Sequence, residues 1–301
     1  MTQFLELDFV WNALAICVVI GILLSYFGVH VVGRGIVFVD LALGQISMLG
    51  VAFAEFIDGD VTIISILFTL IGAFLLSLIK VKDTRLKQEA IIGIVYAVAS
   101  AATVLLISKA AHSDSDISEV LFGSFFTVTD SQIVQTIVVF GAIGLMHVIF
   151  RKRFFELTDW FRKDQIHEIG VFDFWNFLFY LGLGLAIVLA VRVGGVIPVF
   201  AYLVVPPVSG ILVAMKRSVV VAVAIVTSVI GSILGIYFSL SFDFPAGSSV
   251  VAMLGVLFAV AAGIRLIKRS EVRSPKSEVR SPKSGVRSPE SEVGDPDSII
   301  S

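Results

Sequence analysis

The sequence predicts an all-α, polytopic integral membrane protein that crosses the bilayer about nine times. Three observations support this fold class: the composition, the length of the apolar segments, and the distribution of charge between them. Of the 301 residues, 57% are hydrophobic and 15% are charged, and the mean hydropathy is +0.99. A soluble globular domain carries about 25% charged residues, so this composition excludes an ordinary soluble domain.

The apolar segments have the length that a membrane span requires. A helix needs about 20 apolar residues to cross a hydrocarbon core about 30 Å thick. Nine segments qualify: 10–32, 36–57, 61–79, 90–111, 125–150, 177–196, 197–215, 219–240 and 248–266. The sixth and seventh meet at residues 194–198, Gly-Gly-Val-Ile-Pro, where the lack of a polar loop predicts either a sharp turn or a broken helix.

Charge separates the connecting segments into two sets, as expected when cytoplasmic loops retain Lys and Arg. One set holds the basic residues at 34, 80–87, 151–163, 216–217 and 265–269, and the other holds the acidic residues at 6–8, 58–60, 114–119 and 243. This distribution predicts an outer N-terminus and a cytoplasmic C-terminus. Lys109 and Arg192 do not fit it, and for Arg192 we expect a partner inside the protein or a polar cavity. The N-terminus lacks the basic region of a cleavable signal peptide, so we expect the first span to be retained.

The chain divides into a transmembrane domain, residues 1–268, and a tail, residues 269–301. The tail repeats the heptapeptide Glu-Val-Arg-Ser-Pro-Lys-Ser with variations. A proline in every repeat is incompatible with a coiled coil, and so few apolar residues predict a disordered cytoplasmic segment.

Several classes of function are excluded by what the sequence lacks. It contains no G-x-x-x-x-G-K-[ST] phosphate loop, no H-E-x-x-H and no G-x-S-x-G, so we expect no enzyme activity and no nucleotide hydrolysis by this chain. Cys17 is the single cysteine, which excludes a disulfide framework. A net charge of −2 makes nucleic acid a poor candidate partner.

Polar groups inside apolar spans are costly and are therefore candidates for function. The second span carries Asp40, Gln45 and Ser47, and the fourth begins with Glu89 and continues to Tyr96. Each also has a purely structural interpretation. Asp40 could cap its helix or pair with Arg34, Gln45 could form an interhelical hydrogen bond, and Glu89 could pair with Lys87.

Residues 34–50, Arg-Gly-Ile-Val-Phe-Val-Asp-Leu-Ala-Leu-Gly-Gln-Ile-Ser-Met-Leu-Gly, resemble the second-helix motif of the permease subunits of metal ABC importers, the zinc, manganese and iron uptake (ABC-3 type) family. Further similar segments follow in order at residues 89–96, 121–130, 193–199, 204–207 and 243–247, so the resemblance covers roughly residues 10–268.

This resemblance implies a type II ABC importer-like permease fold, a permease homodimer, and a prokaryotic cytoplasmic (inner) membrane location. It also implies a transported divalent metal ion (Zn, Mn or Fe) or its complex, with no permanently bound cofactor. A separate cytosolic ABC ATPase would bind ATP, and an extracytoplasmic metal-binding protein would deliver the cargo.

The resemblance implies that Asp40, Gln45, Ser47, Glu89 and Tyr96 line the pathway, with Asp40 and Gln45 as transient metal contacts. Many relatives carry Asp-x-x-x-His in this helix, whereas this chain has Leu41 and Gln45 at the matching positions. Asp40 is one residue away, or about 100° of helix rotation. A neutral amide is a poor zinc ligand, so the sequence does not identify the metal.

The longest basic connection, residues 151–176, is the expected contact with the ATPase. Within it, residues 164–170 resemble the family's coupling helix, which implies coupling roles for Asp164, Glu168 and Gly170. The alternative for this connection is an amphipathic interfacial helix involving Trp160, Phe161 and Phe172.

A second class of function remains as an alternative, an ion-coupled secondary transporter of a small solute. It would favour inverted repeats and paired broken helices with acids near the bilayer midplane. Residues 194–198 supply one candidate break, and no repeat is clear.

Overall fold

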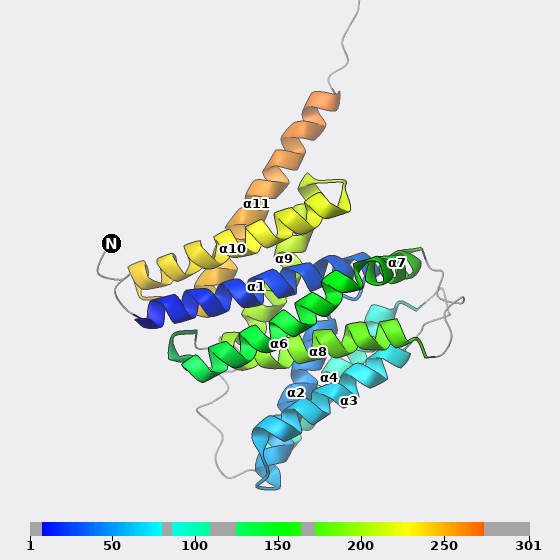
Figure 1. Cartoon of the computed structure of the whole chain (residues 1–301), viewed down its shortest axis with the longest axis vertical. Helices are drawn as coiled ribbons and strands as arrows, with labels where there is room; N and C mark the ends of the chain where they lie inside the picture. Colours follow the sequence, from blue (N-terminus) through cyan, green and yellow to red (C-terminus); the bar gives the residue numbers. More distant parts are fainter. Residues whose placement is uncertain (1–7, 80–85, 109–124, 164–171, 274–301) are drawn as a thin grey trace, which may run out of the picture.

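The computed structural model describes residues 8–79, 86–108, 125–163 and 172–273. Within these ranges the chain forms ten α-helices and one 3-10 segment (Figure 1): α1 Asp8–Arg34, α2 Val39–Phe56, α3 Val61–Leu78, α4 Gln88–Ile107, η2 Phe125–Thr127, α6 Asp130–Ile149, α7 Arg151–Arg162, α8 Phe174–Gly194, α9 Val196–Val213, α10 Arg217–Phe242 and α11 Ala246–Arg273. All the α-helices except α7 are long and apolar enough to cross a membrane. The predicted all-α fold with nine spans is confirmed.

Local capping moves two of the predicted helix starts. The fifth span begins at Asp130 rather than 125, because Thr129 and Gln132 form a reciprocal capping box. The sixth begins at Phe174 rather than 177, where the Asp173 side chain accepts a hydrogen bond from the backbone N–H of Asn176 at 2.6 Å. In both cases the cap satisfies helix N–H groups that would otherwise lack partners.

A sharp turn separates the sixth and seventh spans. Gly195 is the single residue between α8 and α9, and it adopts a φ of +78°. Glycine reaches this region without the steric cost that a Cβ imposes. Of the two conformations that the sequence allows here, the structure therefore has the turn.

The helices pack as two groups joined through the middle of the molecule. In Figure 1, α10 and most of α11 lie above α1 and α9 crosses behind it, while α3 and most of α2 and α4 lie below α8, with α6 beside both α1 and α8. Helix α1 packs mainly on α9 and α10, and α3 packs on both α2 and α8. In the most apolar windows of α1 and α8, 67% and 72% of residues are buried, against 17% in α4 and α11. The core is therefore built around α1 and α8, while α4 and α11 present apolar faces to lipid or another chain.

Helix α11 runs to Arg273 and so continues past the predicted domain boundary at residue 268. The rest of the tail lies outside the described residues, as does Lys109, and the disorder of the tail stays a prediction.

Candidate functional site

Asp40 and Ser47 lie on one face of α2, two helical turns apart, and both are buried. Their exposed fractions are 3% and 4%, and Asp40 Oδ1 has no hydrogen-bond partner in the described part of the chain. The ion pair with Arg34 is not formed, because Arg34 bonds to other residues described below. Asp40 is thus a buried carboxylate at the start of a span, facing the protein interior.

Gln45 leaves α2 in a different direction from Asp40. Five residues of α-helix correspond to about 500° of rotation, which puts the two side chains about 140° apart around the axis. Gln45 is half-buried, on the same side of α2 as Leu41. A single α2 therefore does not bring Asp40 and Gln45 together on one face.

Glu89 and Tyr96 share one side of α4, two turns apart. Glu89 is half-buried, and Tyr96 is 38% exposed. They flank a stripe of buried residues at Ile92, Ala99 and Thr103, and α4 packs against α2. Among the described residues neither side chain forms a hydrogen bond or an ion pair, and Glu89 does not pair with Lys87.

No preformed metal site is evident in the parts of the chain that the structure describes. No group of three or more His, Cys, Asp or Glu side chains gathers there closely enough to hold an ion. Arg192, one of the two cations that do not fit the charge pattern, lies in the last turn of α8 and donates a hydrogen bond to Oγ1 of Thr62, at the start of α3, at 2.8 Å.

Helix α7 lies in the connection for which an amphipathic helix involving Trp160, Phe161 and Phe172 was the alternative, and it contains the first two of these residues. Its charged start, Arg-Lys-Arg, resembles a loop, but the buried residues Phe154, Leu157, Thr158 and Phe161 follow the i, i+3, i+4, i+7 spacing of an amphipathic helix. This spacing is the signal that could have revealed it. The predicted coupling residues Asp164, Glu168 and Gly170 lie outside the described residues, between α7 and α8 in the chain.

A buried polar network, which no local sequence pattern predicts, holds α7 against the end of α1. Arg34 Nε donates to Thr158 Oγ1 at 3.3 Å, and the Thr158 hydroxyl donates to the Phe154 carbonyl at 2.9 Å. His30 Nδ1 lies 2.8 Å from the same Thr158 oxygen. A hydroxyl has one proton to donate, so His30 donates here and carries its proton on Nδ1.

The network continues from Arg34 into α8 and α3. Arg34 Nη1 donates to Asn176 Oδ1 at 3.1 Å, and Asn176 Nδ2 donates to the Ser77 carbonyl at 2.8 Å. The Arg34 guanidinium carbon also lies 3.7 Å from the centre of the Phe179 ring, a cation–π arrangement. Four helices, α1, α7, α8 and α3, are thus joined through the side chains of Arg34, Thr158 and Asn176.

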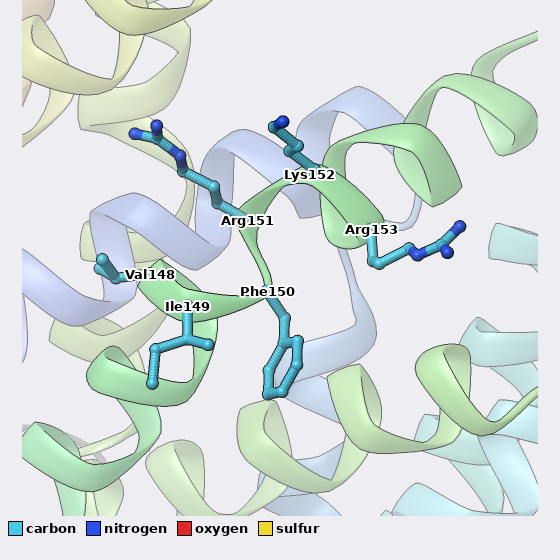
Figure 2. A pocket seen from close by; sticks show the side chains of 6 residues that line it. All are labelled: Val148, Ile149, Phe150, Arg151, Lys152 and Arg153. Atoms are coloured by element: carbon cyan, nitrogen blue, oxygen red, sulfur yellow. The ribbon is translucent and has the colours of Figure 1, made fainter.

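A shallow hollow of about 650 Å³ opens at the junction of α6 and α7, lined by residues 148–153 (Figure 2). Arg151 and Lys152 project from the start of α7, while Phe150 points the opposite way. Since its charged lining side chains are all basic, this hollow is unsuited to binding a cation.

The chain is similar in sequence and in fold to known membrane transport proteins. The chain is 26% identical over 260 residues to the manganese transport system membrane protein MntC of Halalkalibacterium halodurans, covering 86% of this chain and 88% of that protein. A solved structure of PsaBC from Streptococcus pneumoniae in complex with Fab superposes with a TM-score of 0.72 at 27% identity, covering 86% of this chain and 94% of that chain.

A second solved structure, an inward-facing conformation of a putative metal-chelate type ABC transporter, shares the fold with a TM-score of 0.62 at 18% identity, covering 83% of this chain and 85% of that chain. Residues 6–265 match the sequence model of the ABC 3 transport family. Because this match extends over nearly all of the nine-span region, the chain belongs to the ABC 3 transport family.

Proposed function

We propose that the chain is the membrane permease subunit of an ABC importer that carries a divalent transition metal ion or its complex across the cytoplasmic membrane. The observation that carries the proposal is the family match over residues 6–265, which covers eight candidate membrane helices and nearly all of the ninth. The similarity to a manganese transport protein over 86% of the chain supports manganese as the first cargo to test, with iron and zinc as alternatives.

The pathway in this proposal runs along the half-buried side of α2 that carries Gln45 and the adjoining side of α4 that carries Glu89 and Tyr96. These side chains offer amide, carboxylate and phenol oxygens, which can replace part of an ion's hydration shell transiently. Asp40 and Ser47 support this surface from the buried side of α2. A second permease copy would enclose the pathway, in keeping with the low burial of α4 in a single chain.

Transport in this proposal depends on two separate partners. A cytosolic ATPase binds ATP and acts on the connection between α7 and α8, where Asp164, Glu168 and Gly170 are the proposed contacts. An extracytoplasmic metal-binding protein delivers the cargo. The N-terminus is outside and the C-terminus is cytoplasmic, because the basic residues of Arg34, α7 and the start of α10 gather at one end of the bundle.

Elemental analysis of cells across Mn, Fe, Zn and Co tests the cargo. We expect deletion of the gene to lower one metal under scarcity, wild-type protein to restore it, and Asp40→Ala or Gln45→Ala to restore it incompletely. No change in any metal on deletion would contradict the proposal. Uptake into proteoliposomes that follows an ion gradient without ATP would favour the secondary-transporter alternative instead.

A further inference from the structure

We propose that Arg34 is a positioning residue that links the cytoplasmic ends of α7 and α8 to α1, so that movement of the α7–α8 connection is transmitted into the transmembrane helices. The inference rests on the proposed function, since it requires an ATPase that acts on this connection. The link consists of one guanidinium, its two hydrogen-bond acceptors and the helices that carry them.

The two acceptors of Arg34 lie on either side of the connection in the chain. Thr158 belongs to α7, which precedes it, and Asn176 belongs to the first turn of α8, which follows it. Arg34 Nε donates to the first at 3.3 Å and Arg34 Nη1 to the second at 3.1 Å. A planar guanidinium holds its donors at fixed angles to one another, so displacing either acceptor moves or breaks its bond to the end of α1.

The contacts of Arg34 and Asn176 extend to both groups of helices, α9–α10–α11 and α2–α3–α4. Helix α1 packs on α9 and α10, whereas Asn176 donates to the carbonyl of Ser77 in the last turn of α3, and α3 packs on α2. Arg34 and Asn176 therefore connect the α9–α10–α11 group to the α2–α3–α4 group at their cytoplasmic ends. Relative motion of two such groups is how alternating access is achieved.

The surroundings of Arg34 favour contacts that can break and re-form over a permanent buried ion pair. The residue is 7% exposed, yet in the described part of the chain no carboxylate lies within 4 Å of it, and Nη2 has no hydrogen-bond partner. Its partners are a hydroxyl, a carboxamide and an aromatic ring. Hydrogen bonds to neutral groups are weaker than those of a buried ion pair, and the unpaired Nη2 leaves a donor available for a new acceptor.

A second arginine contact on α7 provides a matched control. Arg217, at the start of α10, forms an ion pair with Asp159, the residue next to Thr158, and its side chain is 50% exposed. This pair also ties α7 to a transmembrane helix, but at the surface, where ion pairs contribute little.

The test uses the full-length permease assembled with its cytosolic ATPase in proteoliposomes. Uptake of ⁵⁴Mn²⁺ and ATP hydrolysis are measured on the same preparation, for wild type, Arg34→Lys, Arg34→Gln, Thr158→Val and the control Arg217→Gln. We expect the Arg34 and Thr158 variants to co-purify with the ATPase and to hydrolyse ATP within about twofold of wild type, while Mn²⁺ transported per ATP falls about tenfold or more. Arg217→Gln should stay within about twofold on both measures.

Arg34→Lys is the decisive variant, because it keeps the buried charge and therefore tests the two-acceptor link even if Arg34→Gln lowers the amount of folded protein. An ammonium group lacks the two separated donors that span Thr158 and Asn176. If Arg34→Lys transports as much Mn²⁺ per ATP hydrolysed as wild type, the inference is overturned. It is also overturned if the variant binds less ATPase but the complex that still forms transports the wild-type amount of Mn²⁺ per ATP. Absence of ATP-dependent uptake by the wild-type complex would instead overturn the proposed function.

Discussion

Gly28 of α1 lies directly against the carbonyl oxygen of Leu203 in α9. A Cβ added at Gly28 would stand 1.9 Å from that oxygen and 2.5 Å from Cγ of Pro207. Pro207 is four residues after Leu203 and has no N–H, so the usual helical hydrogen bond to this carbonyl cannot form. Small residues allow membrane helices to approach closely, and here the approach depends on one hydrogen in place of a side chain.

Gly28→Ala should destabilise the protein strongly. The added methyl group meets backbone atoms that cannot move aside, and overpacking of this kind costs about 1–3 kcal/mol or more. The expected result is a lower melting temperature in detergent, measured by size-exclusion chromatography after heating. The matched control is Gly141→Ala in α6, where nothing lies within 4 Å of the added Cβ; equal melting temperatures for the two variants would refute the packing argument.

Tyr202→Phe should cost about 1 kcal/mol of stability. The Tyr202 and Ser232 side chains are fully buried, and their oxygens lie 2.5 Å apart, joining α9 to α10. Ser232 keeps its bond to the Ser228 carbonyl in the variant, so removing the Tyr202 hydroxyl does not leave the Ser232 hydroxyl without a partner. Tyr202→Ala should cost about 3–5 kcal/mol through the cavity it leaves. Thermal unfolding of both variants in the same detergent measures the difference, and similar losses would contradict this account.

Glu89→Gln and Tyr96→Phe should each lower metal uptake while leaving the fold intact, because neither side chain forms a hydrogen bond or ion pair among the described residues. We expect a decrease in initial uptake rate of about tenfold for Glu89→Gln, as for loss of one polar contact on the pathway. The control is Glu55→Gln at the exposed end of α2. Unchanged uptake in both variants at wild-type expression would remove α4 from the proposed pathway.

Gln45→His should shift the cargo preference toward zinc. Imidazole is a good zinc ligand and a neutral amide is a poor one. The measurement is the ratio of zinc to manganese accumulated by cells that express each protein, with Ser47→His, on the buried face of α2, as the control. If only the Ser47 variant changes the ratio, the pathway lies along the opposite face of the helix.

The proposed orientation can be tested by cysteine labelling. Cys17 is fully buried, and Cys17→Ala provides a background without cysteine. In that background, Asp60→Cys should react with a membrane-impermeant maleimide on intact cells, and Lys216→Cys should react only after permeabilisation. The reverse pattern would invert the topology.

The sequence by itself determined the class of the protein, the number of its spans, its family and the basic end of the bundle. These follow from local quantities: a bilayer fixes how many apolar residues a span needs, and residues 34–50 carry the family motif without reference to any distant segment. The turn at Gly195 was also within reach of the sequence, as one of two conformations.

Only the tertiary structure decided which polar residues meet. Arg34 bonds to Thr158 and Asn176 across 124 and 142 residues of chain, and no local pattern specifies such partners. Asp40 and Gln45 are close in sequence, yet the helical rotation directs one toward the protein interior and leaves the other half-exposed. Spans and motifs are properties of a single segment. Burial and hydrogen bonding depend on which helices pack together. That packing depends on how well helix surfaces fit one another, as at the contact of Gly28 with Leu203.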